Sequence, residues 1–159
     1  MGKVLQINTK AKKEKEVGLP KFSVNSVVVS ESGMQGDFNN YRHGHLKNTP
    51  DQALLVMPIE MIKKLNEEGW PIKAGDIGEN ITTEGIPYNE FQPDSVFKAG
   101  EVEFQITYAC TPCNNLEYLP YVGKDKGNEF IKTMVDRRGW YAKVLKEGKI
   151  KVGDGISKL

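Results

Sequence analysis

The chain has 159 residues, enough for one domain with a sizeable core and too few for two ordinary domains. Hydrophobic residues make up 38% and charged residues 27%, which excludes collagen-like, coiled-coil and wholly disordered classes. The 22 Lys and Arg nearly balance the 21 Asp and Glu, so no overall field draws the chain to nucleic acid or an anionic membrane. We therefore expect a single domain over residues 1–159 that binds neither.

Residue usage also indicates a compartment. No run of about 18 apolar residues occurs, and the first residues lack a hydrophobic secretory signal, so we expect a cytoplasmic protein. Only two cysteines are present. In a cytosolic chain a structural disulfide is disfavoured, which favours a chemical role for a thiol.

The first third alternates short strands with polar segments. Residues 4–8 predict a strand, and the lysine-rich residues 10–16 predict a solvated loop. Three successive valines within residues 26–30 predict a buried strand. Residues 31–52 are rich in Gly, Asn, His and Asp and have no apolar period, so they predict a long loop. Such a loop in a small domain is often functional.

The middle of the chain predicts a strand that runs into a helix. Residues 53–57 form the strand, and Pro58 suits the first turn of the helix. The apolar positions recur at helical spacing, at Ile59, Ile62 and Leu65. Gly69 is placed to cap the end of this helix.

The second half contains many short strands separated by glycine turns. The predicted elements are a strand at 81–82, a hairpin over 96–108, a short helical stretch after residue 113, a helix over 128–136, and two or three strands over 141–156. Short strands avoid exposed edges when the sheet closes on itself. We therefore predict a mixed, mainly β fold: a closed or nearly closed β-barrel with a few peripheral helices.

Two cysteines lie between a predicted strand and a predicted helical stretch. A helix N-terminus makes a thiolate available near neutral pH, so Cys110 and Cys113 are candidate reactive thiols. Pro112 directs Cys113 to the turn, so we expect Cys113 to react first and the more packed Cys110 to act as a resolving thiol. A thioredoxin-like pair, a zinc ligand set and small core residues are the alternatives.

Histidines in the polar segment are candidates for proton transfer. His43 and His45 follow Arg42, and Asp37 could orient an imidazole. The alternative is a solvated turn.

Two arginines follow the last predicted helix. Arg137 and Arg138 could favour the helix dipole at its C-terminus, or together form a fork for a phosphate. Both interpretations stay open. No phosphate-loop pattern for nucleotides is present, because the turn at Gly75–Gly78 lacks the Lys-Ser/Thr ending.

Several short motifs occur in a fixed order along nearly the whole chain. They are Gly36-Asp37, Gln52-Ala53-Leu54-Leu55, the turn and strand from Gly75 to Ile86, Pro112-Cys113, and the segment from Gly139 to Leu145. In this order they resemble the MOSC domain family, named for the C-terminal region of molybdenum cofactor sulfurases, in its stand-alone bacterial form. The resemblance implies a strand-rich barrel whose cysteine carries sulfur as a persulfide or, in amidoxime-reducing relatives, ligates molybdenum.

The resemblance also implies a function and a site. It points to a protein that binds a molybdopterin-type cofactor or its metal and carries sulfur on Cys113, with a pterin cofactor or a sulfur donor or acceptor protein as partner and no pyridoxal phosphate. The expected cofactor-binding residues are Asp37, Arg42, His43, His45, Gly78, Glu79, Asn80, Arg137 and Arg138, with Cys113 as the metal ligand. The alternatives are a non-catalytic pterin-binding or chaperone module and a small molybdenum-dependent reductase. Relatives commonly carry an arginine shortly before the cysteine, where this chain has Thr111 and Pro112.

Overall fold

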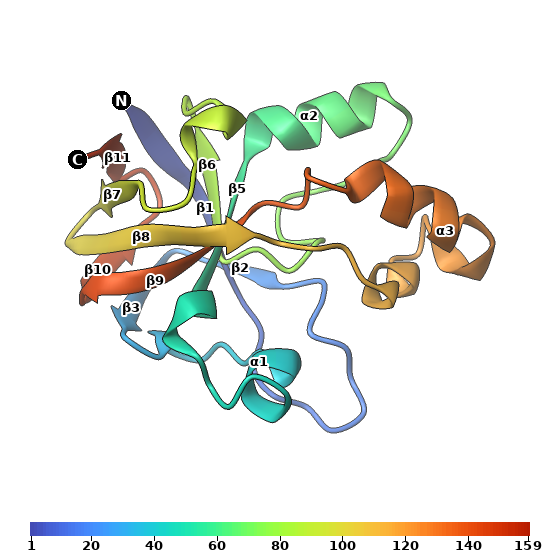
Figure 1. The fold of residues 1–159 in the computed structure, drawn as a ribbon, viewed down its shortest axis with the longest axis horizontal. Helices are drawn as coiled ribbons and strands as arrows, with labels where there is room; N and C mark the ends of the chain where they lie inside the picture. The colour runs from blue at the N-terminus through green and yellow to red at the C-terminus, as the bar shows by residue number, and fades with distance from the viewer.

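Seven strands close into a mixed β-barrel in the computed structural model, which describes residues 1–159 (Figure 1). Around the ring the order is β11, β7, β8, β9, β5, β6 and β1, and β1 then pairs with β11. Only β5 and β6 are parallel. The strands are β1 (Gly2–Thr9), β5 (Leu54–Pro58), β6 (Ile81–Glu84), β7 (Val96–Ala99), β8 (Val102–Ala109), β9 (Trp140–Lys146) and β11 (Gly155–Lys158). The predicted closed, mainly β barrel is confirmed.

Four further strands extend this barrel. β2 (Phe22–Val24) adds to β1 outside the ring. A separate three-stranded sheet has the order β10 (Gly148–Lys151), β3 (Ser26–Ser30) and β4 (Gly33–Met34). The strand predicted at 26–30 is present, but it is not wholly buried: Val28 is 50% exposed, since only one face of β3 packs on the core.

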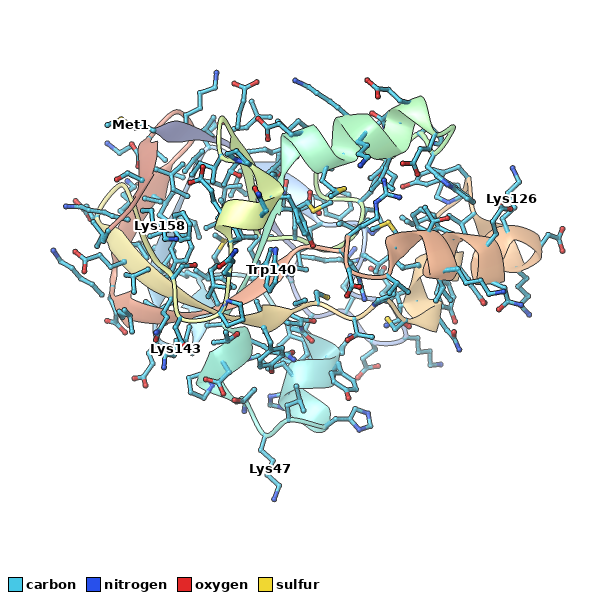
Figure 2. All side chains as sticks on the ribbon, turned by 45° about the horizontal axis from the view of Figure 1, so that its top comes forward. Met1, Lys47, Lys126, Trp140, Lys143 and Lys158 are labelled. Atoms are coloured by element: carbon cyan, nitrogen blue, oxygen red, sulfur yellow. The ribbon has the colours of Figure 1, made fainter.

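Helices pack outside the barrel (Figure 1). They are α1 (Asn40–Gly44), α2 (Ile59–Glu67) and α3 (Gly123–Met134), with three 3-10 turns, η1 (Pro50–Gln52), η2 (Tyr88–Glu90) and η3 (Asn114–Tyr118). None of these helices has the length and apolar character needed to cross a lipid bilayer. Met1 and Lys158 lie toward one end of the molecule and Lys126 on α3 toward the other (Figure 2).

The apolar side chains form two cores. One fills the barrel with residues from nearly every strand, including Ile7, Phe97 and Phe104, all fully buried. The other joins α2 to η3 and α3, with Leu65 and Phe130 fully buried. Burying a side chain of this size contributes about 1.5–3 kcal/mol. The second core therefore fixes the segment that follows β8 against the end of the barrel.

The helix predictions were partly right. α2 follows Pro58 as predicted, with Pro58 at the N-cap rather than inside the first turn, and Gly69 adopts φ +101° just after the helix. The later helix begins at Gly123 and ends at Met134, not at 128–136, because Phe130 and Met134 pack into the second core and the chain turns away after them.

The prediction of an unbroken loop over residues 31–52 was wrong. This segment contains β4, α1 and η1. The Asn39 side chain accepts a hydrogen bond from the Arg42 amide and so caps α1, while Thr49 caps η1. Polar capping residues, not an apolar period, start these short elements.

Candidate functional site

Two loops meet where β8 ends and β9 begins. Ala109 lies opposite Trp140 in the ladder, and the Cys110 amide donates to the Gly139 carbonyl at 2.9 Å. Figure 1 shows β8 running toward η3 and α3, from which the chain returns into β9. The cysteine pair and the arginine pair, far apart in sequence, are therefore neighbours.

Arg138 contacts the exposed cysteine. Its Nη1 donates to the Thr111 carbonyl at 3.0 Å and lies 3.4 Å from Cys113 Sγ, and its Nη2 reaches the Ile77 carbonyl at 3.5 Å. Arg138 is only 8% exposed, and its Nε has no hydrogen-bond partner. The loop before β9 thus places a cation beside Cys113.

The two cysteines have different environments. Cys113 is exposed at the turn before η3, while Cys110 is 1% exposed. Burial raises the pKa of the Cys110 thiol, and the nearby Arg138 guanidinium opposes this rise without cancelling it. The predicted difference in packing, with Cys113 at the turn and Cys110 buried, is confirmed.

A second polar centre surrounds Asp37. Its Oδ2 accepts hydrogen bonds from Lys21 Nζ at 2.7 Å and Asn80 Nδ2 at 2.8 Å, and its Oδ1 accepts from the Lys10 amide at 2.9 Å. The Lys21 and Asp37 side chains are only 5% and 9% exposed. A cavity of about 40 Å³ lies beside this ion pair and is also lined by Gly78.

Arg42 lines the same cavity and holds the surrounding segment together. Its Nε donates to the Thr49 carbonyl at 2.6 Å, Nη1 to the Ser32 carbonyl at 2.5 Å and Nη2 to the Asn48 carbonyl at 3.4 Å. Burial lowers the pKa of Arg42, with the Asp37 carboxylate acting in the opposite direction. Arg42 therefore stabilises α1 and the segments on both sides of it.

The thiol centre and the Asp37 cavity adjoin each other. Gly78 lines the cavity and directly follows Ile77, whose carbonyl accepts from Arg138. Tyr141 also lines the cavity and lies beside Cys110. Burial is the main cause that raises the pKa of Tyr141, and the neighbouring Cys110 adds to the rise. The loops that carry Asp37 and Gly78 therefore lie together at one end of the barrel, as predicted. That their residues bind a cofactor remains a prediction.

Glu79 lies inside the protein and does not line the cavity. It is fully buried, and its Oε1 accepts from the Gly75 amide at 2.6 Å and from Thr82 Oγ1 at 3.1 Å. Burial raises the pKa of Glu79 to about 7, against the lowering effect of these hydrogen bonds. Glu79 holds the turn from which Asn80 reaches Asp37. The expectation that Glu79 itself faces the cavity as a cofactor-binding residue was therefore wrong.

The histidines lie outside the cavity. His43 Nδ1 pairs with Asn48 Oδ1 at 3.0 Å, and the His45 ring stacks on Tyr41 with centroids 5.0 Å apart. Asp37 bonds to neither imidazole, since Lys21 and Asn80 occupy its carboxylate. The expected Asp-oriented histidine is not formed.

The predicted arginine fork is also not formed. Arg137 makes a bidentate ion pair with Glu68 at the end of α2, at 2.6 and 2.8 Å, whereas Arg138 turns toward Cys113. Both arginines follow α3, which has ended at Met134. The two guanidinium groups therefore serve separate partners.

Several cavity residues were not among the predicted site residues, Lys21 and Gln52 among them. Lys21 reaches Asp37 from the start of β2, and Gln52 lines the cavity from η1. No local pattern around Lys21 indicates this contact, because it depends on how β2 pairs with β1. The structure contains no group of three or more His, Cys, Asp or Glu side chains that could hold a metal ion.

The protein is thus a closed mixed β-barrel with an exposed cysteine beside a buried arginine at one end. The family model for the MOSC domain matches residues 41–157, and the chain belongs to this family. The family is associated with the molybdenum cofactor.

Similar proteins support this assignment. Protein YiiM of Escherichia coli strain K12 is 25% identical over 130 residues, which cover 78% of this chain and 55% of YiiM. The chain therefore spans about half the length of this curated relative. Among solved structures, the YUAD protein of Bacillus subtilis matches with a TM-score of 0.79 at 15% identity, over 98% of this chain and 93% of that chain. YiiM of Geobacillus stearothermophilus matches with a TM-score of 0.75 at 23% identity, over 100% and 75%. These two structures share the fold.

Proposed function

We propose that this protein is a sulfur carrier of molybdenum cofactor metabolism that holds sulfane sulfur as a persulfide on Cys113. In the loading step, the Cys113 thiolate attacks the outer sulfur of a persulfide on a donor protein. A new S–S bond forms on Cys113, the S–S bond of the donor breaks, and the donor cysteine leaves as a thiolate. An acceptor nucleophile then takes the outer sulfur from Cys113 and restores its thiolate.

The contact between Arg138 and Cys113 carries this proposal. Arg138 is buried and anchored by the Thr111 and Ile77 carbonyls, so its charge is held at the exposed sulfur rather than free in solvent. A fixed cation stabilises the terminal anion of a persulfide. Exposure of Cys113 leaves room for a donor protein to approach.

Cys110 offers a second way to release the sulfur. Its thiol, once deprotonated, attacks Cys113 Sγ, which closes a Cys110–Cys113 disulfide and releases the outer sulfur as hydrosulfide. A cellular dithiol then reduces the disulfide and regenerates both thiols. The burial of Cys110 and its raised pKa make this release slower than direct transfer to an acceptor. Free thiols of this kind suit a reducing compartment, so we also propose a cytoplasmic location.

The cavity beside Asp37, with about 40 Å³, is too small to enclose a whole molybdopterin, because pockets for ligands of that size have volumes of roughly 300–1,000 Å³. An open pocket of about 400 Å³ shares Ser32 and Arg42 with this cavity. Protein side chains alone would not complete the coordination of a molybdenum ion on Cys113, because no group of three or more His, Cys, Asp or Glu side chains gathers there. We therefore derive no step through a bound cofactor, and the geometry favours sulfur transfer over a pterin chaperone or a molybdenum reductase.

Mass spectrometry of the intact, unreduced protein after incubation with a persulfide donor tests the proposal. A gain of one sulfur atom on the Cys113 peptide is expected, and Cys113→Ser should abolish it. Cys110→Ser should load normally and release hydrosulfide more slowly when no acceptor is present. Arg138→Gln should slow loading, while the matched control Arg137→Gln, which changes a guanidinium bound to α2, should leave it unchanged.

Other outcomes would contradict sulfur transfer. Equal loss of loading in both cysteine variants would mean that the pair works as a dithiol redox unit. Stoichiometric molybdenum or tungsten in the purified protein, lost in Cys113→Ser, would instead support a metal-dependent reductase. Bound pterin without any sulfur on Cys113 would support a cofactor-binding module.

A further inference from the structure

The surface beside Cys113 is formed by segments that lie far apart in the sequence. Cys113 is exposed directly before η3. The lysine-rich loop of residues 10–16 leads to Leu19, which belongs to the second core together with Leu116 of η3. The same loop lies beside α1, where the Asn40 side chain donates to the Glu16 carbonyl at 3.4 Å (Figure 1). We call the surface formed by residues 10–16, α1 and η3 the thiol face.

The lysine-rich loop also approaches the guanidinium that contacts Cys113. A Cβ on Gly78 would lie 3.8 Å from the Leu19 Cβ. Ile77 directly precedes Gly78, and its carbonyl accepts from Arg138. A molecule that reaches Cys113 therefore comes close to this loop as well.

Positive charge exceeds negative charge on the loop and on α1. Residues 10–16 hold four lysines and two glutamates. Glu16 forms ion pairs with two of these lysines, whereas Lys12 and Lys15 form none. Residues 38–50, which include α1, hold one arginine and one lysine and no acidic residue. Because the whole chain has a charge of only +1, this excess is local to the thiol face.

Two acidic side chains at this end of the barrel are already engaged. Asp37 pairs with Lys21 at 2.7 Å. Glu117 of η3 packs against α3, where a Cβ on Gly127 would lie 2.6 Å from the Glu117 side chain. These carboxylates therefore do not balance the lysines of the loop.

We propose that the thiol face docks a sulfur-donor protein whose persulfide cysteine lies in an acidic surface. This proposal rests on the proposed sulfur-carrier function and adds the kind of partner. Charges of opposite sign on two proteins speed their encounter and fix their orientation. Two tyrosines of the thiol face, Tyr41 in α1 and Tyr118 in η3, are 57% and 69% exposed. Tyrosine is enriched among the residues that contribute most to protein–protein binding.

Loading of the full chain by synthetic peptide persulfides tests the proposal. Three peptides each carry one cysteine persulfide, flanked by four glutamates, four glutamines or four lysines. The outer sulfur moves to Cys113, and the peptide cysteine leaves as a thiolate. Mass spectrometry over time gives the loading rate. At low ionic strength the acidic peptide should load Cys113 about tenfold faster than the basic peptide, and about 0.5 M salt should reduce this ratio to about twofold or less.

Reversal of charge on the thiol face locates the effect. Lys12→Glu combined with Lys15→Glu should slow loading by the acidic peptide and speed loading by the basic peptide, so that the preference is lost. Both side chains are exposed, so the fold should be kept. The matched control, Lys149→Glu with Lys158→Glu, changes the net charge equally, on β10 and β11 at the end of the barrel away from α3 (Figure 1). It should keep the preference for the acidic peptide.

Three results would overturn the acidic partner. They are equal loading rates for all three peptides, faster loading by the basic peptide, and an equal loss of preference in both double variants, which would assign the effect to total charge. If no peptide loads Cys113, sulfur carrying itself is refuted and the docking proposal falls with it. Loading without a charge preference refutes the docking proposal alone, so the two failures give different results.

Discussion

The buried carboxyl group of Glu79 should make the protein less stable as the pH rises. Burial raises its pKa from the ordinary 4.5 to about 7. Between these values the unfolded chain has released the proton and the folded chain still holds it, so the free energy of unfolding falls with rising pH. At 1.36 kcal/mol for each pKa unit, the full loss is about 3 kcal/mol, of which about 2.5 kcal/mol falls between pH 5 and pH 8.

Glu79→Gln isolates this effect. The amide keeps an oxygen that accepts from the Gly75 amide and Thr82, and its NH2 group replaces Oε2, which has no partner. Urea unfolding of both proteins at pH 5 and pH 8 gives the difference in their stability. The unaltered protein should lose about 2.5 kcal/mol relative to the variant over this range.

A second carboxylate serves as the control. Its hydrogen bond with Lys3 lowers the pKa of the half-buried Glu84, so the stability that Glu84 contributes is present above pH 5 and is lost as the pH falls below that. The stability difference between Glu84→Gln and the unaltered protein should therefore stay constant between pH 5 and pH 8 and shrink at lower pH. A stability difference for Glu79→Gln that is independent of pH, or that favours the unaltered protein at pH 8, would refute the reasoning from burial.

Three further predictions concern the end of the barrel. Gly139→Ala should destabilise the fold by about 2 kcal/mol or more in urea unfolding, because φ is +93° there and a Cβ would lie 2.5 Å from the Val56 carbonyl oxygen; a neutral effect would contradict this backbone geometry. Iodoacetamide should label Cys113 in the folded protein and Cys110 only after unfolding, as peptide mass spectrometry over time would show; faster labelling of Cys110 would reverse the assignment. Arg137→Gln breaks a partly exposed ion pair and should cost about 1 kcal/mol or less, so a much larger loss in urea unfolding would show that the pair is structurally essential.

The sequence predicted elements whose pattern is local and missed contacts that depend on distant partners. The hairpin over 96–108 follows from alternating apolar residues and a glycine turn, and both strands formed as expected. α1 depends on the Asn39 cap and on a buried Arg42 that binds carbonyls on both sides of the helix. No apolar period marks such a helix, so the segment was predicted as a loop.

The same distinction applies to the site. The order of the family motifs indicated Cys113, and Pro112 before it indicated a turn. The cation beside Cys113 comes from Arg138, 25 residues further along, and reaches it because β8 and β9 pair. Spacing alone predicts neither the pairing of these strands nor the direction of the Arg138 side chain, which precedes the left-handed Gly139. Lys21 was missed for the same reason.

The pairing of β1 with β11 has a consequence for how the barrel assembles. Gly2 lies opposite Ile156, so the ring closes between the first and last strands of the chain. While the chain emerges from a ribosome, β1 and β7 keep unpaired edges until the final strand is released. Contacts this distant in sequence slow folding. We therefore expect the nascent chain to need protection from edge-to-edge aggregation until its last strand joins the ring.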